Sequence, residues 1–409
     1  MNEKIMIGDL QFQQAERDAV NRVMDSGRIS EGRETKAFED EFADWVGTKH
    51  CVAVSSGTAA LMVGLKTLEY LGMIPSAASL DNENAPDWAP ATTQRPARVL
   101  VPALTFVATA NAVKLCGMEP VFADVDRYTY TMEPDYVAIH AVDAVLPVHL
   151  FGFGANMAAI NSAARWRTSS PLIIEDACEA HGTLVDGHKA GSQATWGAFS
   201  FYIAHTVQAG ELGAIVTDNA DIARVARQIK AHGRLCSCKV CTRNTTGCHR
   251  LKDGDPRFLA QFIGYNFKAM EWSTALARVQ LAKVDENIAQ RKENAQTLMR
   301  LLLDGQDDFI LPGFRDTDVP MVYPIVLKDG DRNEVLVKLD DAGVEARPAF
   351  GCIPLQQPAY AQYKQRYAGM LPVSEWVGES GFYVGCHQYL TGEQLERMAE
   401  AILESVKRC

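Results

Sequence analysis

The sequence predicts an α/β fold in which a mostly parallel sheet is flanked by helices and is followed by a smaller C-terminal α/β lobe. Two observations predict it. Short, continuously apolar runs alternate with helical patterns through the first part of the chain, and long helical patterns dominate after residue 270. Strands that are apolar at every position are buried on both faces, as in parallel sheets covered by helices. The chain has 409 residues, which is enough for a large core divided between two lobes.

The expected strands follow one another at short intervals. The first, CVAV at 51–54, leads through a Ser-Gly turn into a helical pattern that ends near residue 68, and the segment 98–117 repeats this scheme. Further apolar runs that we expect to form strands lie at 120–126, 144–153, 171–180, 198–204 and 213–218. Residues 76–96, rich in Pro, Asn, Asp and Ser, are expected to form a surface insertion.

Composition excludes several classes of protein. The net charge of −11 argues against a nucleic-acid surface, which needs clustered Lys and Arg. No apolar run approaches the length of a membrane span, and the N-terminus lacks the apolar segment of a secretory signal. We therefore expect a cytoplasmic protein. Its ten cysteines are then expected to be free, metal-binding or redox-active rather than disulfide-paired.

Polar residues follow several of the predicted strands, where parallel sheets bind ligands. The turn Ser56–Thr58 precedes a helix, whose N-terminal N–H groups and dipole favour an anion. Asp176 ends a buried strand and needs a partner there, and a protonated heterocyclic nitrogen is a suitable one. Ser200, in the next strand, could bind the same anion. Phe106 could lie over a planar ligand, although on its own it is better explained by core packing.

A series of motifs in the same order, running nearly end to end, resembles the sugar aminotransferases and dehydratases of the DegT/DnrJ/EryC1/StrS family. The motifs are SGRISEGRETKAFEDEFADWVGTKHCVAVSSGTAAL, VPALTFVATANAV, PVFADVD, PVHLFGF, IIEDACEAHG, FSFYIAH with GELGAIVTD, and GYNFKAMEWSTALARVQL. The resemblance implies the fold-type I transferase fold, pyridoxal or pyridoxamine 5′-phosphate as cofactor, and a homodimer with shared active sites. We expect the chain to divide into an N-terminal segment at 1–32 that packs on the small lobe, a large cofactor-binding domain at 33–270 and a small C-terminal domain at 271–409.

The resemblance also implies roles for single residues. Gly57, Thr58 and Ser200 would hold the cofactor phosphate. Phe106 would stack on the ring and Asp176 would pair with its nitrogen. The roles of Asp176 and of the phosphate-binding residues agree with the interpretation from the residues alone, whereas the stacking role of Phe106 rests on the resemblance.

One further residue of this set lies in the GYN motif. Asn266 would reach the phosphate of the partner subunit, as the resemblance implies.

His205 stands where the family has a lysine. Lysine binds the cofactor covalently and returns it after transamination. Imidazole cannot bind the cofactor covalently, so we do not expect turnover as an aminotransferase. It can, however, move a proton to and from a carbon atom. This exchange resembles the pyridoxamine-phosphate-dependent 3-dehydratases of nucleotide-activated 4-keto-6-deoxy sugars, in which histidine removes a proton from the cofactor and the C3 hydroxyl leaves.

Residues 234–250 are expected to form a polar loop, and they contain four cysteines, Cys236, Cys238, Cys241 and Cys248. Such a cluster in a cytoplasmic enzyme indicates a metal or iron–sulfur site. A structural zinc site and unligated thiols remain as alternatives.

Cys178 favours the iron–sulfur interpretation. Between Cys178 and Cys236 lie 57 residues, and a single residue separates Cys236 from Cys238. This spacing of cysteines resembles that of the [2Fe–2S]-containing CDP-4-keto-6-deoxyglucose 3-dehydrases. Cys248 is the favoured fourth ligand and Cys241 the alternative. The resemblance implies a flavin and iron–sulfur reductase as electron donor.

Two more residues are carried over from that relative. Tyr202 and Glu179 match positions that line its cofactor site, and we expect them to belong to the catalytic site. Ordinary packing or solvent exposure is the alternative explanation for both.

The segment 346–360 departs from that relative where the sugar should bind. The positions retained are Arg347, Phe350, Gly351, Gln357 and Pro358. Ile353 stands in place of Asn and Gln356 in place of Arg. Arginine suits a diphosphate through paired hydrogen bonds, so we expect a substrate without a nucleotide diphosphate, such as another keto-sugar or a cyclitol.

The sequence is compatible with three functions. The first is reductive C3-deoxygenation with pyridoxamine phosphate and an iron–sulfur cluster. The second is a dehydratase without redox chemistry, whose cysteine loop holds a structural metal or nothing. The third is a non-catalytic, sugar-binding relative. The spacing of Cys178 favours the first, and the intact Asp176, Ser200 and Asn266 disfavour the third.

Overall fold

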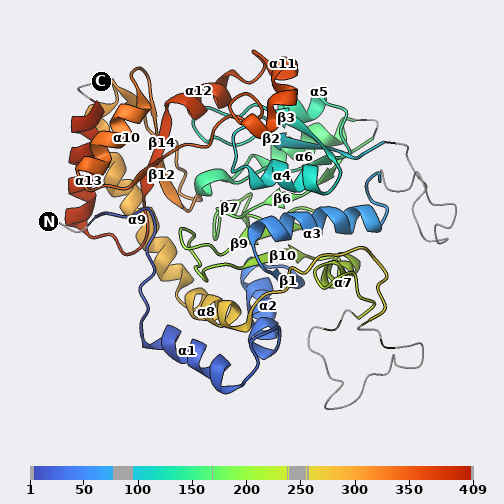
Figure 1. The fold of residues 1–409 in the computed structure, drawn as a ribbon. Coiled ribbons are helices and arrows are strands. Elements are labelled where there is room, and N and C mark those ends of the chain that lie inside the picture. The colour runs from blue at the N-terminus through green and yellow to red at the C-terminus, as the bar shows by residue number, and fades with distance from the viewer. Residues whose placement is uncertain are drawn as a thin grey trace.

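The computed structural model describes residues 4–76, 95–167, 169–236, 238, 255 and 258–406. These residues form a large α/β lobe and a smaller C-terminal lobe with its own sheet (Figure 1). Most of the insertion expected at 76–96 lies outside the described residues, as do Cys241 and Cys248.

The large lobe contains two sets of strands in the orders β3-β2-β4-β5 and β6-β9-β10-β1. The strands are β1 (His50–Val54), β2 (Arg98–Pro102), β3 (Glu119–Ala123), β4 (Ala144–Val145), β5 (Leu172–Ile173), β6 (Glu175–Asp176), β9 (Gly197–Ser200) and β10 (Gly213–Thr217). β5 and β6 are successive pieces of one chain segment. The amide of Asp176 donates to the carbonyl of Pro147 at 3.0 Å, so the two sets continue into each other beside the extension of β4.

The predicted mostly parallel sheet is confirmed, with a reversal at β10. The pairs β2–β3, β2–β4, β4–β5 and β6–β9 are parallel, whereas β10 is antiparallel to both β9 and β1. The connection of residues 201–212 between β9 and β10 contains no helix that could cross over the sheet, so the chain returns antiparallel. This connection carries His205.

Helices cover both faces of the sheet. One face packs on α3 (Gly57–Tyr70), α4 (Ala108–Leu115) and α7 (Ala220–Ile229), and the other on α2 (Arg33–Val46), α6 (Met157–Arg165) and α8 (Glu271–Leu281). Alternate strand residues face opposite cores: Val99 and Val101 lie in one core, and Leu100 lies in the other. Two apolar faces explain why the strands are apolar at every position.

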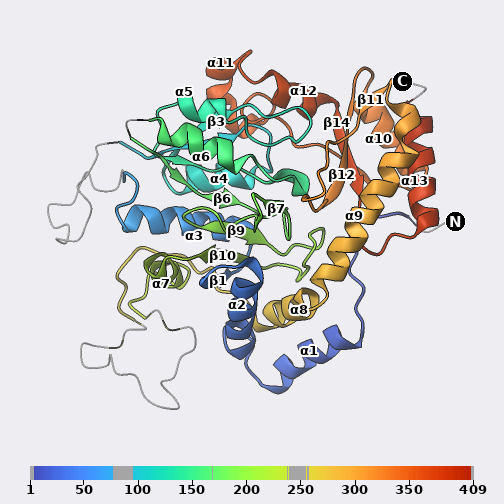
Figure 2. The ribbon, with the colours of Figure 1, turned by 180° about the vertical axis from the view of Figure 1, so that it is seen from behind.

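The small lobe is an antiparallel sheet in the order β11-β12-β14-β13. Its strands are β11 (Phe309–Ile310), β12 (Val322–Leu327), β13 (Ala346–Pro348) and β14 (Gly381–Gly385). Its core includes residues of α9 (Val284–Leu301), α10 (Arg332–Asp341) and α13 (Gly392–Val406). The helix α9 runs from α8 to the small lobe and thus joins the two lobes (Figure 2).

The remaining elements are short or peripheral. They are α1 (Gln14–Asp25), α5 (Asp135–Ile139), α11 (Lys364–Tyr367), α12 (Pro372–Ser380), the hairpin β7 (Leu184–Val185) with β8 (His188–Lys189), and 3₁₀ turns at Leu150–Gly152, Leu303–Gly305 and Pro358–Tyr363. Among the described helices, none is both long and apolar enough to cross a membrane.

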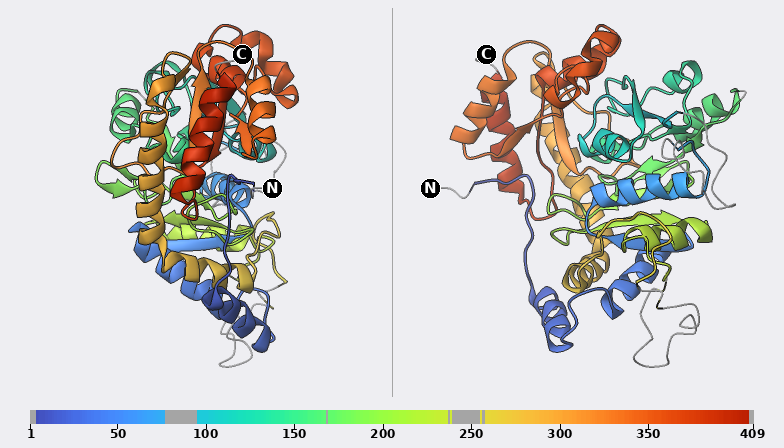
Figure 3. Two further views of the ribbon diagram at one scale, coloured as in Figure 1. Left: turned by 90° about the vertical axis from the view of Figure 1, so that its left-hand side faces the viewer. Right: turned by 45° about the vertical axis from the view of Figure 1, so that its right-hand side comes forward.

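The N-terminal segment contacts both lobes. Ile5 pairs with Val344 of the small lobe, and the Ile7 amide donates to the Glu345 carboxylate at 3.0 Å. Farther along, α1 packs on α8, so the segment passes down one side of the molecule (Figure 3).

Candidate active site

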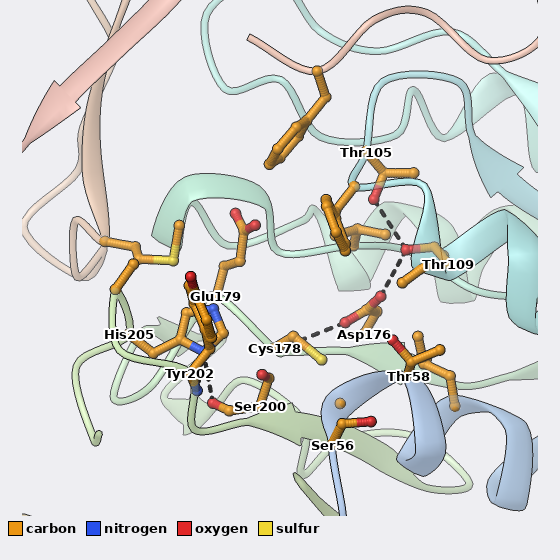
Figure 4. Close-up of a pocket in the computed structure, with 18 of the residues that line it drawn as sticks. Ser56, Thr58, Thr105, Thr109, Asp176, Cys178, Glu179, Ser200, Tyr202 and His205 are labelled. Atoms are coloured by element: carbon orange, nitrogen blue, oxygen red, sulfur yellow. Dashed lines mark hydrogen bonds between the residues drawn. The ribbon is translucent and has the colours of Figure 1, made fainter. Parts of the chain in front are cut away.

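A cavity of about 310 Å³ opens where the carboxyl ends of β6 and β9 meet the N-terminus of α3 (Figure 4). It is lined by nine of the residues expected in the site, namely Gly57, Thr58, Phe106, Asp176, Cys178, Glu179, Ser200, Tyr202 and His205. The carboxyl ends of strands are the expected location of ligands in α/β sheets. Asn266, Cys236 and Cys238 are described but are not among the lining residues.

The N-terminus of α3 forms one end of the cavity. The Ser56 side chain caps the helix by accepting from the Ala59 amide at 3.1 Å. A Cβ atom on Gly57 would lie 2.7 Å from Ser200 Cβ and 2.9 Å from Cys178 Sγ, so only glycine fits without movement. The helix has 14 residues, and its first N–H groups favour an anion. This end of the cavity fits a phosphate.

Asp176 is a buried carboxylate that lines the cavity (Figure 4). It accepts from Thr109 Oγ1 at 2.8 Å and from the Cys178 amide at 3.2 Å, and burial raises its pKa despite these bonds. Within the described residues no lysine, arginine or histidine forms an ion pair with it. A protonated ring nitrogen would supply the missing cation, so the carboxylate fits the nitrogen of a pyridoxal-type ring.

Phe106 lines the same cavity with a half-exposed ring, at 5.7 Å between centroids from Phe350. The structure therefore brings together a helix N-terminus, a carboxylate without a cationic partner and an aromatic ring with a free face. These groups fit pyridoxal or pyridoxamine phosphate.

His205 lies on the β9–β10 connection and is 8% exposed. Its Nδ1 atom is 2.9 Å from the Ser200 carbonyl oxygen and 3.2 Å from the Tyr202 amide nitrogen. Burial lowers its pKa to about 4; the Ser200 contact opposes this shift and the Arg291 charge adds to it. The imidazole is therefore neutral near pH 7.

Glu179 and Tyr202 lie near His205 in the same cavity (Figure 4). Glu179 is buried, accepts from the Phe151 amide at 2.8 Å, and has its pKa raised to about 8, chiefly by burial. The Tyr202 ring is 6.2 Å from the His205 ring and is 42% exposed. Both side chains can contact a bound ligand.

Several residues at the site were not expected from the sequence, and three of them make informative contacts. Thr109 binds Asp176 and contacts Thr105 Oγ1 at 3.0 Å, while Tyr383 lines the cavity from β14. Arg291 of α9 contacts the backbone of His205. The only available signal for Thr109 was its place in the motif VPALTFVATANAV. Tyr383 and Arg291 are too distant in sequence to be linked to the site without the fold.

The predicted cluster ligands are only partly described. Cys178 lines the cavity, and burial together with the Asp176 carboxylate raises the pKa of its thiol well above the usual range. Cys236 is partly buried and Cys238 is exposed. Within the described part of the chain, no group of three or more His, Cys, Asp or Glu residues could hold a metal ion. The described residues alone therefore do not assemble an iron–sulfur site.

Gln356 is occupied by internal contacts. Its Oε1 atom accepts from the Cys352 amide at 2.7 Å, and its Nε2 atom donates to the Glu375 carbonyl at 2.8 Å. Ile353 is fully buried in the core. Neither residue lines the cavity, whereas Arg347 and Phe350 do.

Known proteins resemble this chain over nearly its full length. The model of the DegT/DnrJ/EryC1/StrS aminotransferase family matches residues 11–403. GDP-perosamine synthase of Caulobacter vibrioides is 28% identical over 407 residues, covering 95% of this chain and 94% of that protein. GDP-4-keto-6-deoxy-D-mannose 3-dehydratase of Yersinia pseudotuberculosis is 26% identical over 400 residues, covering 95% of each.

Solved structures share the fold. E. coli GDP-4-keto-6-deoxy-D-mannose-3-dehydratase with bound hydrated PLP superposes with a TM-score of 0.81 at 22% identity, covering 98% of this chain and 99% of that one. The fold-type I prediction is confirmed, and the relatives support a PLP- or PMP-dependent enzyme of deoxysugar biosynthesis. The relatives include both transaminases and 3-dehydratases. The chain belongs to the DegT/DnrJ/EryC1/StrS aminotransferase family.

Proposed function

We propose that this protein is a pyridoxamine-phosphate-dependent dehydratase that removes the C3 hydroxyl group of a 4-keto sugar or a related hydroxy ketone, with His205 as the base. The observation that carries the proposal is the placement of a neutral histidine in the cavity, on the loop where the family lysine is expected. Of the described residues that line the cavity, none is a lysine.

The cavity residues have complementary roles in this proposal. The N-terminus of α3 with Ser200 holds the phosphate, Asp176 keeps the ring nitrogen protonated, and Phe106 stacks on the ring. When bound, pyridoxamine phosphate supplies an amine that condenses with a ketone and a ring that delocalises electrons.

The base acts on a hydrogen of the cofactor's methylene group. A neutral imidazole can accept that proton at Nε2 because Nδ1 is already engaged with the Ser200 carbonyl. Loss of that proton would promote departure of the C3 hydroxyl group of the bound sugar, and the protonated His205 imidazole could return the proton so that the hydroxyl leaves as water. Glu179 and Tyr202 line the same space and can hydrogen-bond the hydroxyl groups of the sugar.

The substrate is proposed to lack a nucleotide diphosphate. The side chain at position 356 is an uncharged glutamine that is already bound to Cys352 and Glu375. Arg347, which lines the cavity, is paired with the Glu345 carboxylate at 2.7 Å. A keto-sugar or cyclitol fits this environment better than a doubly charged diphosphate does.

In its more specific form, the proposed reaction is a reductive deoxygenation at C3, in which the dehydrated product receives electrons from an iron–sulfur cluster. Cys178, Cys236, Cys238 and Cys248 would bind a [2Fe–2S] cluster, and a flavin and iron–sulfur reductase would deliver electrons to it. The cysteine spacing and the location of Cys178 in the cavity support this form. A second candidate is a dehydratase without redox chemistry, because the described residues contain no group of three His, Cys, Asp or Glu that could hold a metal ion.

Iron analysis separates the two candidates. About two irons and two sulfides per chain in anaerobically purified protein, lost in Cys236→Ser, would support the reductive form. Zinc, or no metal, would favour the dehydratase without redox chemistry.

As further parts of the proposal, the protein is a cytoplasmic homodimer, and Asn266 reaches the phosphate site of the partner subunit.

The base is tested by two substitutions. His205→Asn should lower the rate of dehydration by about 10²–10⁴-fold, while pyridoxamine phosphate still binds. His205→Lys should allow pyridoxal phosphate to be fixed to the protein by borohydride reduction and should introduce transamination. Unchanged dehydration in His205→Asn would refute the proposed role of His205.

A further inference from the structure

Arg291 is a fully buried arginine on α9 that contacts the loop carrying the proposed base. Its Nη2 atom donates to the carbonyl oxygen of His205 at 3.1 Å and lies 3.5 Å from the carbonyl oxygen of Ala204. Nη1 donates to the Met321 carbonyl at 2.8 Å, and Nε donates to Gln388 Oε1 at 3.0 Å. One side chain thus joins α9, the start of β12, the segment after β14 and the β9–β10 connection.

The guanidinium has no counter-charge among the described residues. All of its acceptors are neutral carbonyl or amide oxygens, and no described carboxylate forms an ion pair with it. Burial lowers its pKa to about 10, so the group remains a cation at neutral pH. A buried cation without a counter-charge is unfavourable, and an apolar residue of similar volume would fill the space at lower cost. Stability alone is therefore a weak explanation for an arginine at this position.

We infer that Arg291 is a positioning residue that fixes the backbone of His205 and thereby aims its imidazole into the cavity. This inference rests on the proposed function of His205. The imidazole is held at Nδ1 by the Ser200 carbonyl, and the backbone of the same residue is held by Arg291. Because both the backbone and Nδ1 of His205 are held, the ring orientation is fixed, and the free Nε2 atom points in one direction. Proton transfer depends strongly on such alignment.

The electrostatic effect of Arg291 acts in the same sense as its geometric effect. Its charge contributes to the lowered pKa of His205, after burial, and so helps to keep the imidazole unprotonated. Other titratable groups line the cavity or face the ring, namely Tyr202 and Glu211 on the same connection, Asp176, Cys178, Glu179 and His181 on β6 and the segment after it, and Arg347 and Tyr383 from the small lobe. The His181 ring is 6.1 Å from that of His205. Burial lowers the pKa of His181 well below the usual range, so it is neutral as well.

The test is ¹⁵N NMR of histidine-labelled protein, with the His205 signals assigned from the His205→Asn spectrum. Arg291→Lys keeps the charge but loses the multiple hydrogen bonds. We expect shifted or broadened His205 signals and a roughly 100-fold lower kcat on any substrate that is turned over. Binding of pyridoxamine phosphate should be unchanged, because its proposed contacts lie elsewhere. Arg291→Met should also move the His205 titration to higher pH, since the cation is gone.

Arg227→Lys is the matched control. Arg227 is also buried, but it binds the Glu39 carboxylate at 2.9 Å and the Cys51 carbonyl at 2.7 Å, away from the cavity. This variant should lose stability and leave the His205 signals unchanged. If Arg291→Met does not fold, Gln388→Leu removes the acceptor of Nε instead. It should shift or broaden the His205 signals and leave their titration near the wild-type pH, because the cation remains.

Folded Arg291 variants with the wild-type His205 signals and titration would overturn the inference. The NMR result does not depend on turnover. If His205→Asn still dehydrated its substrate, the proposed function would fail while the positioning of His205 by Arg291 would still be measured.

Discussion

The Nδ1 atom of His205 lies 2.9 Å from the carbonyl oxygen of Ser200. A carbonyl oxygen can only accept, so this contact selects the tautomer that carries its proton on Nδ1. The Tyr202 amide points at the same nitrogen from 3.2 Å and would donate to it in the other tautomer, but the carbonyl contact is the shorter of the two. We therefore assign the proton to Nδ1. Nε2 then has a free lone pair, as a general base requires.

The first prediction concerns the base. His205→Asn retains a side-chain N–H that can donate to the Ser200 carbonyl, but it has no basic nitrogen. Dehydration should fall by about 10²–10⁴-fold, whereas the affinity for pyridoxamine phosphate, measured by fluorescence titration, should change little. A variant with loss of cofactor binding and activity together would instead indicate a role in binding.

A second prediction concerns pH. Burial lowers the pKa of both His205 and His387 to about 4, below the ordinary value near 6.5. The unfolded chain therefore takes up these protons first as the pH falls, and stability is lost between about pH 6.5 and pH 4. Each group should lower the free energy of unfolding by about 2 kcal/mol between pH 7 and pH 5.

Urea unfolding at pH 7 and pH 5 measures this loss. His387→Gln should lose less stability on acidification than the wild type, because one of the two groups is gone. Equal pH dependence in the two proteins would show that His387 is not buried in its neutral form.

A third prediction concerns the phosphate end of the cavity. In Gly57→Ala the new Cβ would lie 2.7 Å from Ser200 Cβ and 2.9 Å from Cys178 Sγ. Overpacking of this kind costs about 1–3 kcal/mol, and we expect binding of pyridoxamine phosphate to weaken at least about tenfold. Gly392→Ala is the control, since no atom lies within 4 Å of its new Cβ. If both variants bind the cofactor equally well, Gly57 is not part of the site.

A fourth prediction concerns the substrate. Gln356 Oε1 lies 2.1 Å from where a Cβ on Gly378 would be, so the side chain is closely surrounded. Gln356→Arg should lose the bonds to Cys352 and Glu375 and lower the stability by about 1–3 kcal/mol. It should not gain activity on nucleotide diphosphate sugars. Efficient turnover of CDP-4-keto-6-deoxyglucose by the wild type would contradict the proposed substrate class.

Much of the fold follows from local pattern. The fully apolar strands predict a sheet with two covered faces, and alternate residues such as Val99 and Leu100 do enter different cores. The turn before α3 and the carboxylate at the end of β6 mark the cavity because both interrupt apolar surroundings.

Long-range features could not be predicted in this way. The reversal of β10 depends on the path of the β9–β10 connection. Arg291 reaches His205 only because α9 packs between the lobes, and no local pattern links residues that are 86 positions apart. The role of Gln356 depends likewise on contacts with Glu375, which the sequence alone does not place nearby.

The proposed function is tested most directly by analysis of the reaction products by mass spectrometry. Protein loaded with pyridoxamine phosphate is incubated with free and nucleotide-linked 4-keto-6-deoxyhexoses, with glutamate present as an amino donor. We expect the wild type to remove the C3 oxygen from a free sugar, and we expect no detectable removal by His205→Asn. Accumulation of a 4-amino sugar over many turnovers by the wild type would contradict the proposed function, because it would show an aminotransferase that works without the lysine.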